Sequence, residues 1–304
     1  MVMRHVLWLI LLLFSALPFP GFGQTCTTYT VVSAFDRKSG DDVTNLNPED
    51  FEAKLGKNPL SVVSAEPNFS NRLLVLLQTD GTNNDRIEDV VSLATRLARE
   101  APEGRQLAFG AFGKRSIFTK GFNGDPKKRA GEINAVIEDA PTLGKRIALY
   151  DALHNAIALF GAHQPGDTVL VVTDGFDDGS GRAGTEVEKE YLAHATRLLV
   201  MLRQTPSHVM GNFMWKNPEL DRALLERMSA RTGGTYTMFN AYAFGMAWRG
   251  YMLGVNLPES TGKSRKWKLR LQASVRAVRR RPNLLYPEQL PPCVGEERPL
   301  ALSR

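Results

Sequence analysis

Two short apolar runs, each ending in oxygen-bearing side chains and a glycine, dominate the hydrophobic pattern of this chain. The first is Leu73–Leu77, followed by QTDGT at residues 78–82, and the second is Thr168–Val172, followed by TDG at residues 173–175. Apolar runs this short predict strands that are buried on both faces, as in a parallel sheet. We therefore expect two central strands whose polar ends lie at the carboxyl edge, where open α/β sheets bind ligands.

Amphipathic helices alternate with further strands through the middle of the chain. This alternation predicts an α/β fold, with a doubly wound, mostly parallel sheet and one antiparallel edge pair at residues 107–122. The helical spacing of apolar residues predicts helices at 87–98, 127–138, 147–160, 186–203 and 218–231. The remaining strands of this region are predicted at 107–112, 116–122, 209–214 and 235–239.

Both ends of the mature chain are rich in β-forming residues, and we infer that they pair into one small flanking β layer. Residues 266–271 alternate strictly between basic and apolar side chains, which predicts a half-buried antiparallel strand with Trp267 facing inward. The other strands of this layer are predicted at 27–35, 60–65, 251–257, 275–281 and 284–286.

The first residues have the pattern of a secretory signal peptide. A positive start at Arg4 and His5 precedes an apolar run from Val6 to Leu17, and the small residues of Gly21-Phe22-Gly23 mark a cleavage site. We expect a mature chain that begins near Gln24 and is secreted or periplasmic, with an uncleaved anchor as the alternative. No second apolar run of spanning length follows, so stable membrane insertion is not expected after cleavage.

The sequence accordingly divides into five parts. They are a signal peptide at 1–23, an N-terminal β arm at 24–70, an α/β domain at 71–242, a C-terminal β segment at 243–290 and a loose tail at 291–304. The two cysteines, Cys26 and Cys293, lie near the two ends of the mature chain. In an oxidising compartment they predict a disulfide, with two unpaired thiols as the alternative. The chain-entropy model assigns such a long loop a stabilisation of about 4–5 kcal/mol.

Composition is that of an ordinary globular protein, with 304 residues of which 43% are hydrophobic and 23% charged. Net charge is +6, and nine lysines and arginines lie between Lys263 and Arg281. This basic tail raises the alternative function of binding an anionic surface or polyanion. Its alternation favours instead a solvated face that protects a sheet edge, and export argues against nucleic acid as a partner.

The candidate chemistry lies at the ends of the two central strands. Side chains alternate in an extended segment, so Gln78, Asp80 and Thr82 are expected to point the same way, with Asp174 facing them if the strands are neighbours. Oxygen ligands of this kind suit a hard cation such as Mg²⁺ or Mn²⁺. Ordinary strand-to-loop turns are the alternative explanation.

Enzymatic motifs are absent from the sequence. It contains no Gly-x-Ser-x-Gly elbow, no phosphate-binding glycine loop and no His-Glu-x-x-His. His154 is expected on a helix face, and His163, His194 and His208 are scattered along the chain without a placed partner. We therefore expect a protein that is not an enzyme, with a hydrolase as a less favoured alternative.

Five motifs in order give this chain a resemblance to the von Willebrand factor type A (VWFA) domain family, and more closely to its secreted bacterial subgroup. They are QTDGT at 78–82, ALYDAL at 148–153, VVTDG at 171–175, TGG at 232–234 and YMLG at 251–254. The resemblance extends over nearly all of the mature chain. It implies a Rossmann-like VWFA fold that binds proteins at the carboxyl edge of its sheet through a metal-ion-dependent adhesion site.

That metal site departs from the family signature, which is Asp-x-Ser-x-Ser, a threonine and a second aspartate. Gln78, Asp80 and Thr82 occupy the first three positions, Ile147 replaces the threonine, and only Asp174 is unchanged. We therefore expect a secreted, non-enzymatic binding or adhesion module with a degenerate metal site and an unknown protein partner, which contacts the loops at 82–85 and 176–182.

A positively charged side chain is a candidate substitute for the metal. Lys145 and Arg146 directly precede Ile147, and either could pair with Asp80 or Asp174. Solvated loop charges are the alternative for both residues.

Overall fold

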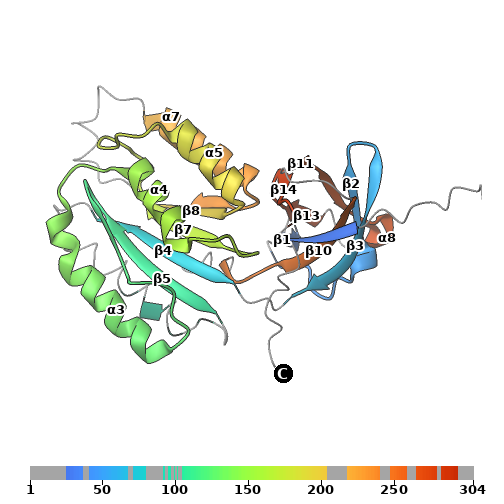
Figure 1. Ribbon diagram of the computed structural model, residues 1–304, viewed down its shortest axis with the longest axis horizontal. Helices are drawn as coiled ribbons and strands as arrows, with labels where there is room; N and C mark the ends of the chain where they lie inside the picture. Colours follow the sequence, from blue (N-terminus) through green and yellow to red (C-terminus); the bar gives the residue numbers. More distant parts are fainter. Residues whose placement is uncertain are drawn as a thin grey trace, which may run out of the picture.

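The computed structural model describes residues 25–36, 41–67, 71–79, 92, 95, 96, 99, 101, 105–203, 218–239, 247–258, 265–278 and 282–293. Two six-stranded sheets lie side by side in Figure 1. We refer to them as the main sheet, on the left of the figure, and the flanking sheet, on the right. The predicted signal peptide, helix 87–98, loop 82–85 and strand 209–214 lie wholly or mostly outside the described residues.

The main sheet is mostly parallel, as predicted. Its order is β6-β5-β4-β7-β8-β9, and every pair is parallel except β5 with the edge strand β6. The chain runs from β4 to β5 on one side and later to β7 on the other, so strand order reverses between β4 and β7. The strands span Arg72–Gln78 (β4), Gln106–Phe112 (β5), Ser116–Phe118 (β6), Thr168–Thr173 (β7), Arg197–Leu202 (β8) and Tyr236–Met238 (β9).

Helices cover both faces of the main sheet. Helices α4 (Leu149–Phe160), α5 (Gly184–His194) and α7 (Pro218–Arg231) lie on one face, and α3 (Pro126–Asp139) lies on the other (Figure 1). The central strands are apolar throughout because alternate residues enter two separate cores. In β4, for example, Leu74 and Leu76 pack with the residues of α4, α5 and α7, while Leu73 and Val75 pack toward α3.

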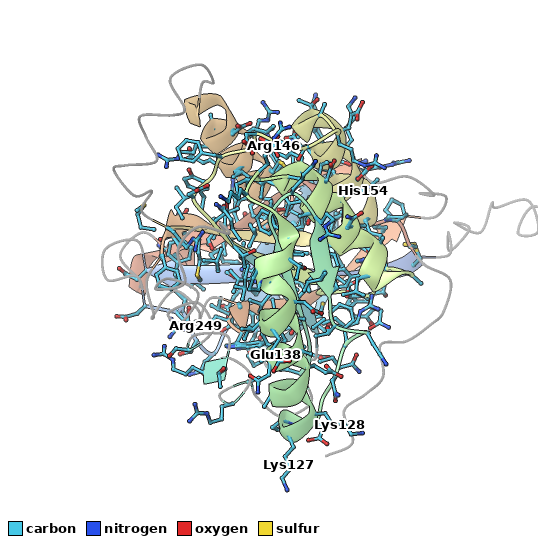
Figure 2. All side chains as sticks on the ribbon, turned by 90° about the vertical axis from the view of Figure 1, so that its left-hand side faces the viewer. Lys127, Lys128, Glu138, Arg146, His154 and Arg249 are labelled. Carbon is cyan, nitrogen blue, oxygen red and sulfur yellow. A yellow bond between two sulfur atoms is a disulfide. The ribbon has the colours of Figure 1, made fainter. Side chains whose placement is uncertain are left out.

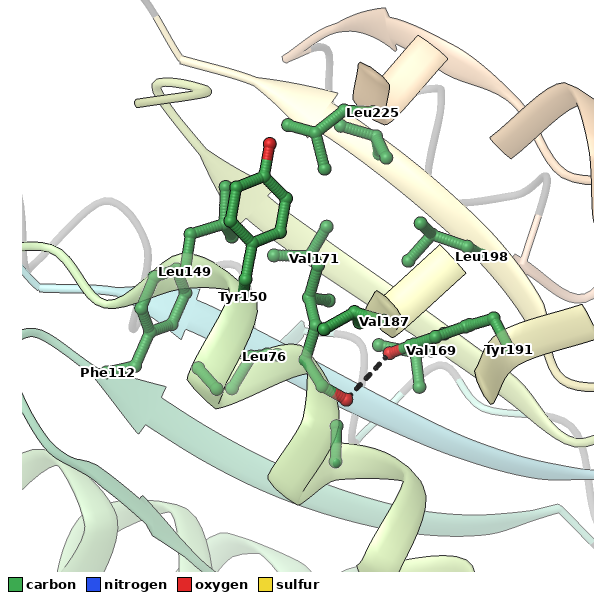
Figure 3. Packing of buried hydrophobic residues seen from close by; sticks show 14 of the residues in the cluster. Leu76, Phe112, Leu149, Tyr150, Val169, Val171, Val187, Tyr191, Leu198 and Leu225 are labelled. Atoms are coloured by element: carbon green, nitrogen blue, oxygen red, sulfur yellow. Dashed lines mark hydrogen bonds between the residues drawn. The ribbon is translucent and has the colours of Figure 1, made fainter. Parts of the chain in front are cut away.

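A hydrogen bond links helices α4 and α5 across the apolar core that they cover. Figure 3 shows Val169 and Val171 of β7 between these helices, with Tyr191 of α5 reaching over to α4. The hydroxyl of Tyr191 donates a hydrogen bond of 3.2 Å to the backbone oxygen of Leu153. A fully buried tyrosine hydroxyl needs such a partner, since leaving it unpaired would cost free energy.

The predicted single helix at 186–203 is wrong. Helix α5 ends at His194, Ala195 adopts a left-handed conformation with φ 55°, and the next apolar run forms the buried strand β8. A short apolar run fits a buried helix and a buried strand equally well by periodicity alone. Its place between β7 and β9 in the sheet decides the question.

The flanking sheet is antiparallel and joins the two ends of the chain, as predicted. Its order is β12-β2-β3-β10-β1-β13. The Cys26–Cys293 disulfide is present, with a Cα–Cα distance of 6.0 Å. The strands span Thr25–Asp36 (β1), Phe51–Leu55 (β2), Asn58–Glu66 (β3), Tyr251–Pro258 (β10), Lys268–Leu271 (β12) and Pro282–Leu285 (β13), and a two-stranded sheet adds Arg265–Lys266 (β11) and Gln289–Leu290 (β14).

The C-terminal segment departs from prediction in one place. Trp267 is buried as expected, and its indole donates to the Pro287 carbonyl at 2.7 Å, while Lys268 and Arg270 of the edge strand β12 are exposed. The strand predicted at 275–281 is wrong, because helix α8 (Ala273–Val278) occupies its first half. Valines favoured a strand there, but Val275 and Val278 are also three residues apart, which suits a helix.

Charged side chains join the two sheets. Arg231 of α7 forms ion pairs with Glu188 of α5 at 2.9 Å and with Glu288 of the C-terminal segment at 2.5 Å, and buried Arg197 donates to the hydroxyl of Ser33 in β1 at 2.9 Å.

Two short 3-10 helices, η1 (Pro48–Asp50) and η2 (Ala140–Leu143), complete the described elements. Within the described part of the chain, none of the helices combines the length and apolar character needed to cross a membrane.

Candidate functional site

The carboxyl edge of the main sheet brings Gln78 of β4 against Thr173 and Asp174 at the end of β7. All three are buried. The Gln78 amide nitrogen donates to Asp174 Oδ2 at 2.8 Å, and its amide oxygen accepts from the Thr173 hydroxyl at 2.5 Å and from the Asp174 backbone N–H at 3.1 Å. The other carboxylate oxygen of Asp174 accepts from the Phe176 N–H at 3.1 Å. The condition stated in the sequence analysis, that the two strands are neighbours, is met, because β4 and β7 pair in parallel.

These contacts decide how Gln78 is oriented. A backbone N–H can only donate, so the atom that faces the Asp174 N–H is the amide oxygen, and the NH₂ group therefore faces the carboxylate. A hard cation at Asp174 would meet these amide hydrogens in place of an oxygen ligand. Gln78 and Asp174 as they stand therefore do not fit a Mg²⁺ or Mn²⁺ ion between them. Asp80 and Thr82 lie outside the described residues, so the complete four-residue metal site stays a prediction.

The loop after β7 caps helix α4. Ala148, at the start of α4, offers no side-chain cap, and the first N–H groups of a helix need acceptors. Asp177 accepts from the Leu149 N–H at 2.8 Å, and Ser180 Oγ accepts from the Tyr150 N–H at 3.0 Å. Asp178 Oδ1 accepts from the Ile147 N–H at 2.5 Å. The polar side chains of this loop thus satisfy backbone donors at the start of α4.

Loop 176–182, which we expect to contact a partner, is buried at its start. Phe176 is 5% exposed, and the guanidinium of Arg222 lies over its ring at 4.8 Å. Arg222 also donates to the Asp174 carbonyl at 3.0 Å. The aromatic ring is covered because α7 reaches the loop, so only Gly181 and Arg182, at the far end, are exposed.

A tyrosine and a carboxylate tie the loop to α7. The Tyr150 hydroxyl donates to Asp221 Oδ1 at 2.8 Å, and the other oxygen of Asp221 accepts from the Asp177 N–H at 3.3 Å. Burial, and then the negative charge of Asp221, raise the pKa of Tyr150, so the phenol stays protonated. Burial also raises the pKa of the Asp177 carboxyl against the opposing effect of its hydrogen bonds.

The two candidate substitute cations lie on the rim of this edge. Arg146 donates to the Asp178 carbonyl, and its Nε lies 3.8 Å from the Asp178 carboxylate. Lys145 is exposed. Pairing of either residue with Asp80 or Asp174 stays a prediction. In Figure 2, Arg146 lies in the upper part of the molecule and Lys127 at the lower end.

Three loops at this edge carry exposed cations that sequence reasoning did not group. The Arg115 N–H donates to the Leu143 carbonyl at 3.0 Å, and the Asp178 N–H donates to the Ile147 carbonyl at 2.9 Å, so the loops after β5, before α4 and after β7 adjoin one another. We define the basic rim by its exposed members, which are Lys114, Arg115, Lys145, Arg146 and Arg182.

Sequence reasoning also missed a grouping at the opposite, amino edge of the main sheet. His163 and His194 were considered scattered, but their ring centroids are 5.6 Å apart, and both lie close to Asp167. The weak signal in the sequence is the spacing of His163 and Asp167 around a Pro-Gly turn.

Comparison with known proteins gives likeness to solved structures only. No protein-family model matches the chain, and no curated protein has a similar sequence. The structure is similar to BatB from Bacteroides thetaiotaomicron, with 15% identity and a TM-score of 0.44 over 57% of this chain and 93% of that one. It is also similar to proximal thread matrix protein 1 from the mussel byssus, solved with a zinc-occupied metal-ion-dependent adhesion site (MIDAS) motif. That match has 14% identity and a TM-score of 0.47 over 67% of this chain and 50% of that one.

Proposed function

We propose that this protein is a VWFA-like, non-enzymatic binding module that contacts an acidic protein partner through the basic rim, without a bridging metal. The observation that carries the proposal is the hydrogen bond from the Gln78 amide to Asp174, which satisfies the carboxylate that the family uses for a metal. The resemblance in sequence supplies the VWFA-like part of the proposal.

The charge distribution at this edge supports an acidic partner. Asp177 and Asp178 turn their carboxylates to the N–H groups at the start of α4. Arg146 and Arg182 have only long contacts with carboxylates, 3.8 Å to Asp178 and 3.7 Å to Glu190, and the other rim cations are also exposed. The Arg146 side chain is 59% exposed and the Arg182 side chain 44% exposed. Fixed cations of this kind attract carboxylates directly and speed association.

The predicted signal peptide and the Cys26–Cys293 disulfide support a location in the periplasm or outside the cell, since disulfides persist in oxidising compartments. The alternative function uses the exposed Lys268 and Arg270 of β12 to bind an anionic surface. Both functions predict salt-dependent binding, so salt alone does not separate them.

Two matched double charge reversals separate them. Fluorescence anisotropy of a labelled polyglutamate peptide is measured with mature protein in EDTA, using Lys114→Glu/Lys145→Glu and Lys268→Glu/Arg270→Glu. Both variants change net charge equally. We expect the rim variant to weaken binding about tenfold, since each exposed charge contributes up to about 1 kcal/mol, and the β12 variant to bind like wild type. Loss only in the β12 variant, a requirement for Mg²⁺, or no binding by wild type would each overturn the proposal.

A further inference from the structure

Two histidines and an aspartate from three segments converge at the amino edge of the main sheet. His163 follows the end of α4, Asp167 directly precedes β7, and His194 is the last residue of α5. One ligand atom of each lies within 4.8 Å of the others. Asp167 is fully buried, and the His163 side chain is 19% exposed.

Among the described residues, the hydrogen bonds around the cluster leave His163 Nδ1 unpaired, whereas the lone pair of His194 is used by Thr196 and would have to be released to a metal ion. His194 Nε2 lies 2.9 Å from the Gly161 carbonyl oxygen, which only accepts, so Nε2 carries the proton and the lone pair of the neutral ring is on Nδ1. That Nδ1 accepts from the Thr196 hydroxyl at 2.7 Å. His163 Nδ1 is buried without a hydrogen-bond partner among the described residues, 3.8 Å from Asp167 Oδ2.

An unsatisfied buried nitrogen beside a carboxylate calls for a proton, a water or a metal ion. A neutral imidazole is the form that ligates a metal.

Asp167 keeps room for one more partner. It accepts from Arg72 Nε at 2.8 Å, from Arg72 Nη2 at 2.6 Å and from the Gln164 N–H at 2.9 Å. A carboxylate offers about four acceptor positions, two on each oxygen, so the one that remains is on Oδ1, because Arg72 Nη2 and the Gln164 N–H both bind Oδ2. These bonds also fix the orientation of the carboxylate, as the outer partners of metal ligands do.

The electrostatic field at the cluster favours a positive charge, and the guanidinium of Arg72 already supplies one. Helices α4 and α5 both end here, and the His194–Gly161 contact joins their carboxyl ends. Each helix carboxyl end carries partial negative charge. The carbonyls of Phe160 and Ala162 share the Arg72 guanidinium at 2.8 Å each. The arginine limits the affinity for a divalent ion because it adds a positive charge close to the site.

We propose that His163, Asp167 and His194 bind one Zn²⁺-class ion, which ties the end of α4 to the end of α5. Two imidazoles and one carboxylate, with a water as fourth ligand, suit tetrahedral zinc, while Mg²⁺ prefers oxygen ligands. Tetrahedral zinc holds its ligand atoms about 3.3 Å apart, so atoms that lie within 4.8 Å of one another would approach by up to about 1.5 Å. This site lies at the opposite edge of the sheet from the VWFA-like one and does not depend on the proposed function.

Calorimetric titration of Zn²⁺ into metal-free mature protein tests the site. The variants are His163→Gln and His194→Gln, which leave the Arg72–Asp167 pair intact. The matched control is His154→Gln, since His154 contacts Glu190 on the α4–α5 surface, away from the cluster. We expect one ion per chain, a loss of at least about tenfold in affinity in each cluster variant, and no change in the control.

Cobalt spectroscopy supplies a readout that does not depend on the variants. Co²⁺ bound to the wild-type protein is expected to show the intense visible absorption of a tetrahedral site, and excess Zn²⁺, but not Mg²⁺, should remove it. The proposal is overturned by wild-type protein that fails to bind zinc, by cluster variants that bind like wild type, or by displacement of cobalt by Mg²⁺. Circular dichroism verifies the fold of each variant, and if one does not fold, the cobalt result decides.

Discussion

The two edges of the main sheet differ in how their polar groups are satisfied. At the carboxyl edge, Gln78 supplies both a donor and an acceptor, so Asp174 and Thr173 are paired without a cation. At the amino edge, His163 Nδ1 lies 3.8 Å from the carboxylate of Asp167 and is unpaired among the described residues, with the ring of His194 close by. An amide that both donates and accepts satisfies its neighbours at the carboxyl edge, whereas one unpaired imidazole nitrogen beside a carboxylate leaves an acceptor available at the amino edge. The motif that resembles a metal site and the geometry that suits a metal thus lie at opposite edges.

The largest expected effect is at the amino edge. Replacing Asp167 with alanine leaves the guanidinium of Arg72, 12% exposed, without its carboxylate. We expect a loss of about 3–5 kcal/mol in the free energy of unfolding, as for other broken buried ion pairs. Urea unfolding in EDTA, followed by tryptophan fluorescence, measures it without any contribution from metal. A loss below about 1 kcal/mol would mean that the other partners of Arg72 hold this edge.

A smaller effect is expected at the carboxyl edge. The Gln78→Leu substitution removes the donor to Asp174 and the acceptor for Thr173 while keeping the volume similar. Leaving these buried groups unpaired should cost about 3 kcal/mol. The same urea experiment measures the loss, with and without Mg²⁺. If Mg²⁺ stabilises the wild-type protein more than the variant, Gln78 contributes to a metal site and the contrast between the edges fails.

The smallest effect is expected at Glu188, which forms ion pairs with Arg227 and Arg231 away from both edges. It provides a comparison for the pH dependence of stability. Burial would raise the pKa of Glu188, but hydrogen bonds from Arg227 and Arg231 outweigh it and lower the pKa below its usual 4.5. A carboxyl with a lowered pKa stabilises the fold above its unfolded pKa, and this contribution disappears as the pH falls through its folded pKa. Glu188→Gln should therefore cost about 1–2 kcal/mol near pH 7, because the arginines are partly exposed.

That difference between Glu188→Gln and wild type should shrink as the pH falls below about 4. Thermal unfolding of both proteins across this range measures it. A difference that stays constant with pH would show that the glutamine loses packing or hydrogen bonds rather than charge. Because Glu188 lies on α5, the same variant also reports whether anchoring that helix to α7 affects the zinc affinity of His194.

Much of the carboxyl edge could be predicted because its residues directly follow strands. Apolar runs identified β4 and β7, and their parallel pairing brings Gln78 and Asp174 together by register. The sequence could not predict whether Gln78 ligates a metal ion or donates a hydrogen bond to Asp174. The answer depends on which end of the amide meets the Asp174 N–H. The burial of Phe176 was missed for a related reason, since its cover comes from Arg222 on a distant helix.

The sequence by itself determined the alternation of helices and strands, the mostly parallel sheet and the pairing of the two chain ends, because hydrophobic periodicity and short-range order encode these features. Only the tertiary structure decided that residues 197–202 form a strand, since a short apolar run suits two kinds of element and the neighbouring strands select one. It also decided that His163, Asp167 and His194 meet. Their contact requires helices α4 and α5 to end at the same edge of one sheet, a fact of packing that no local pattern contains.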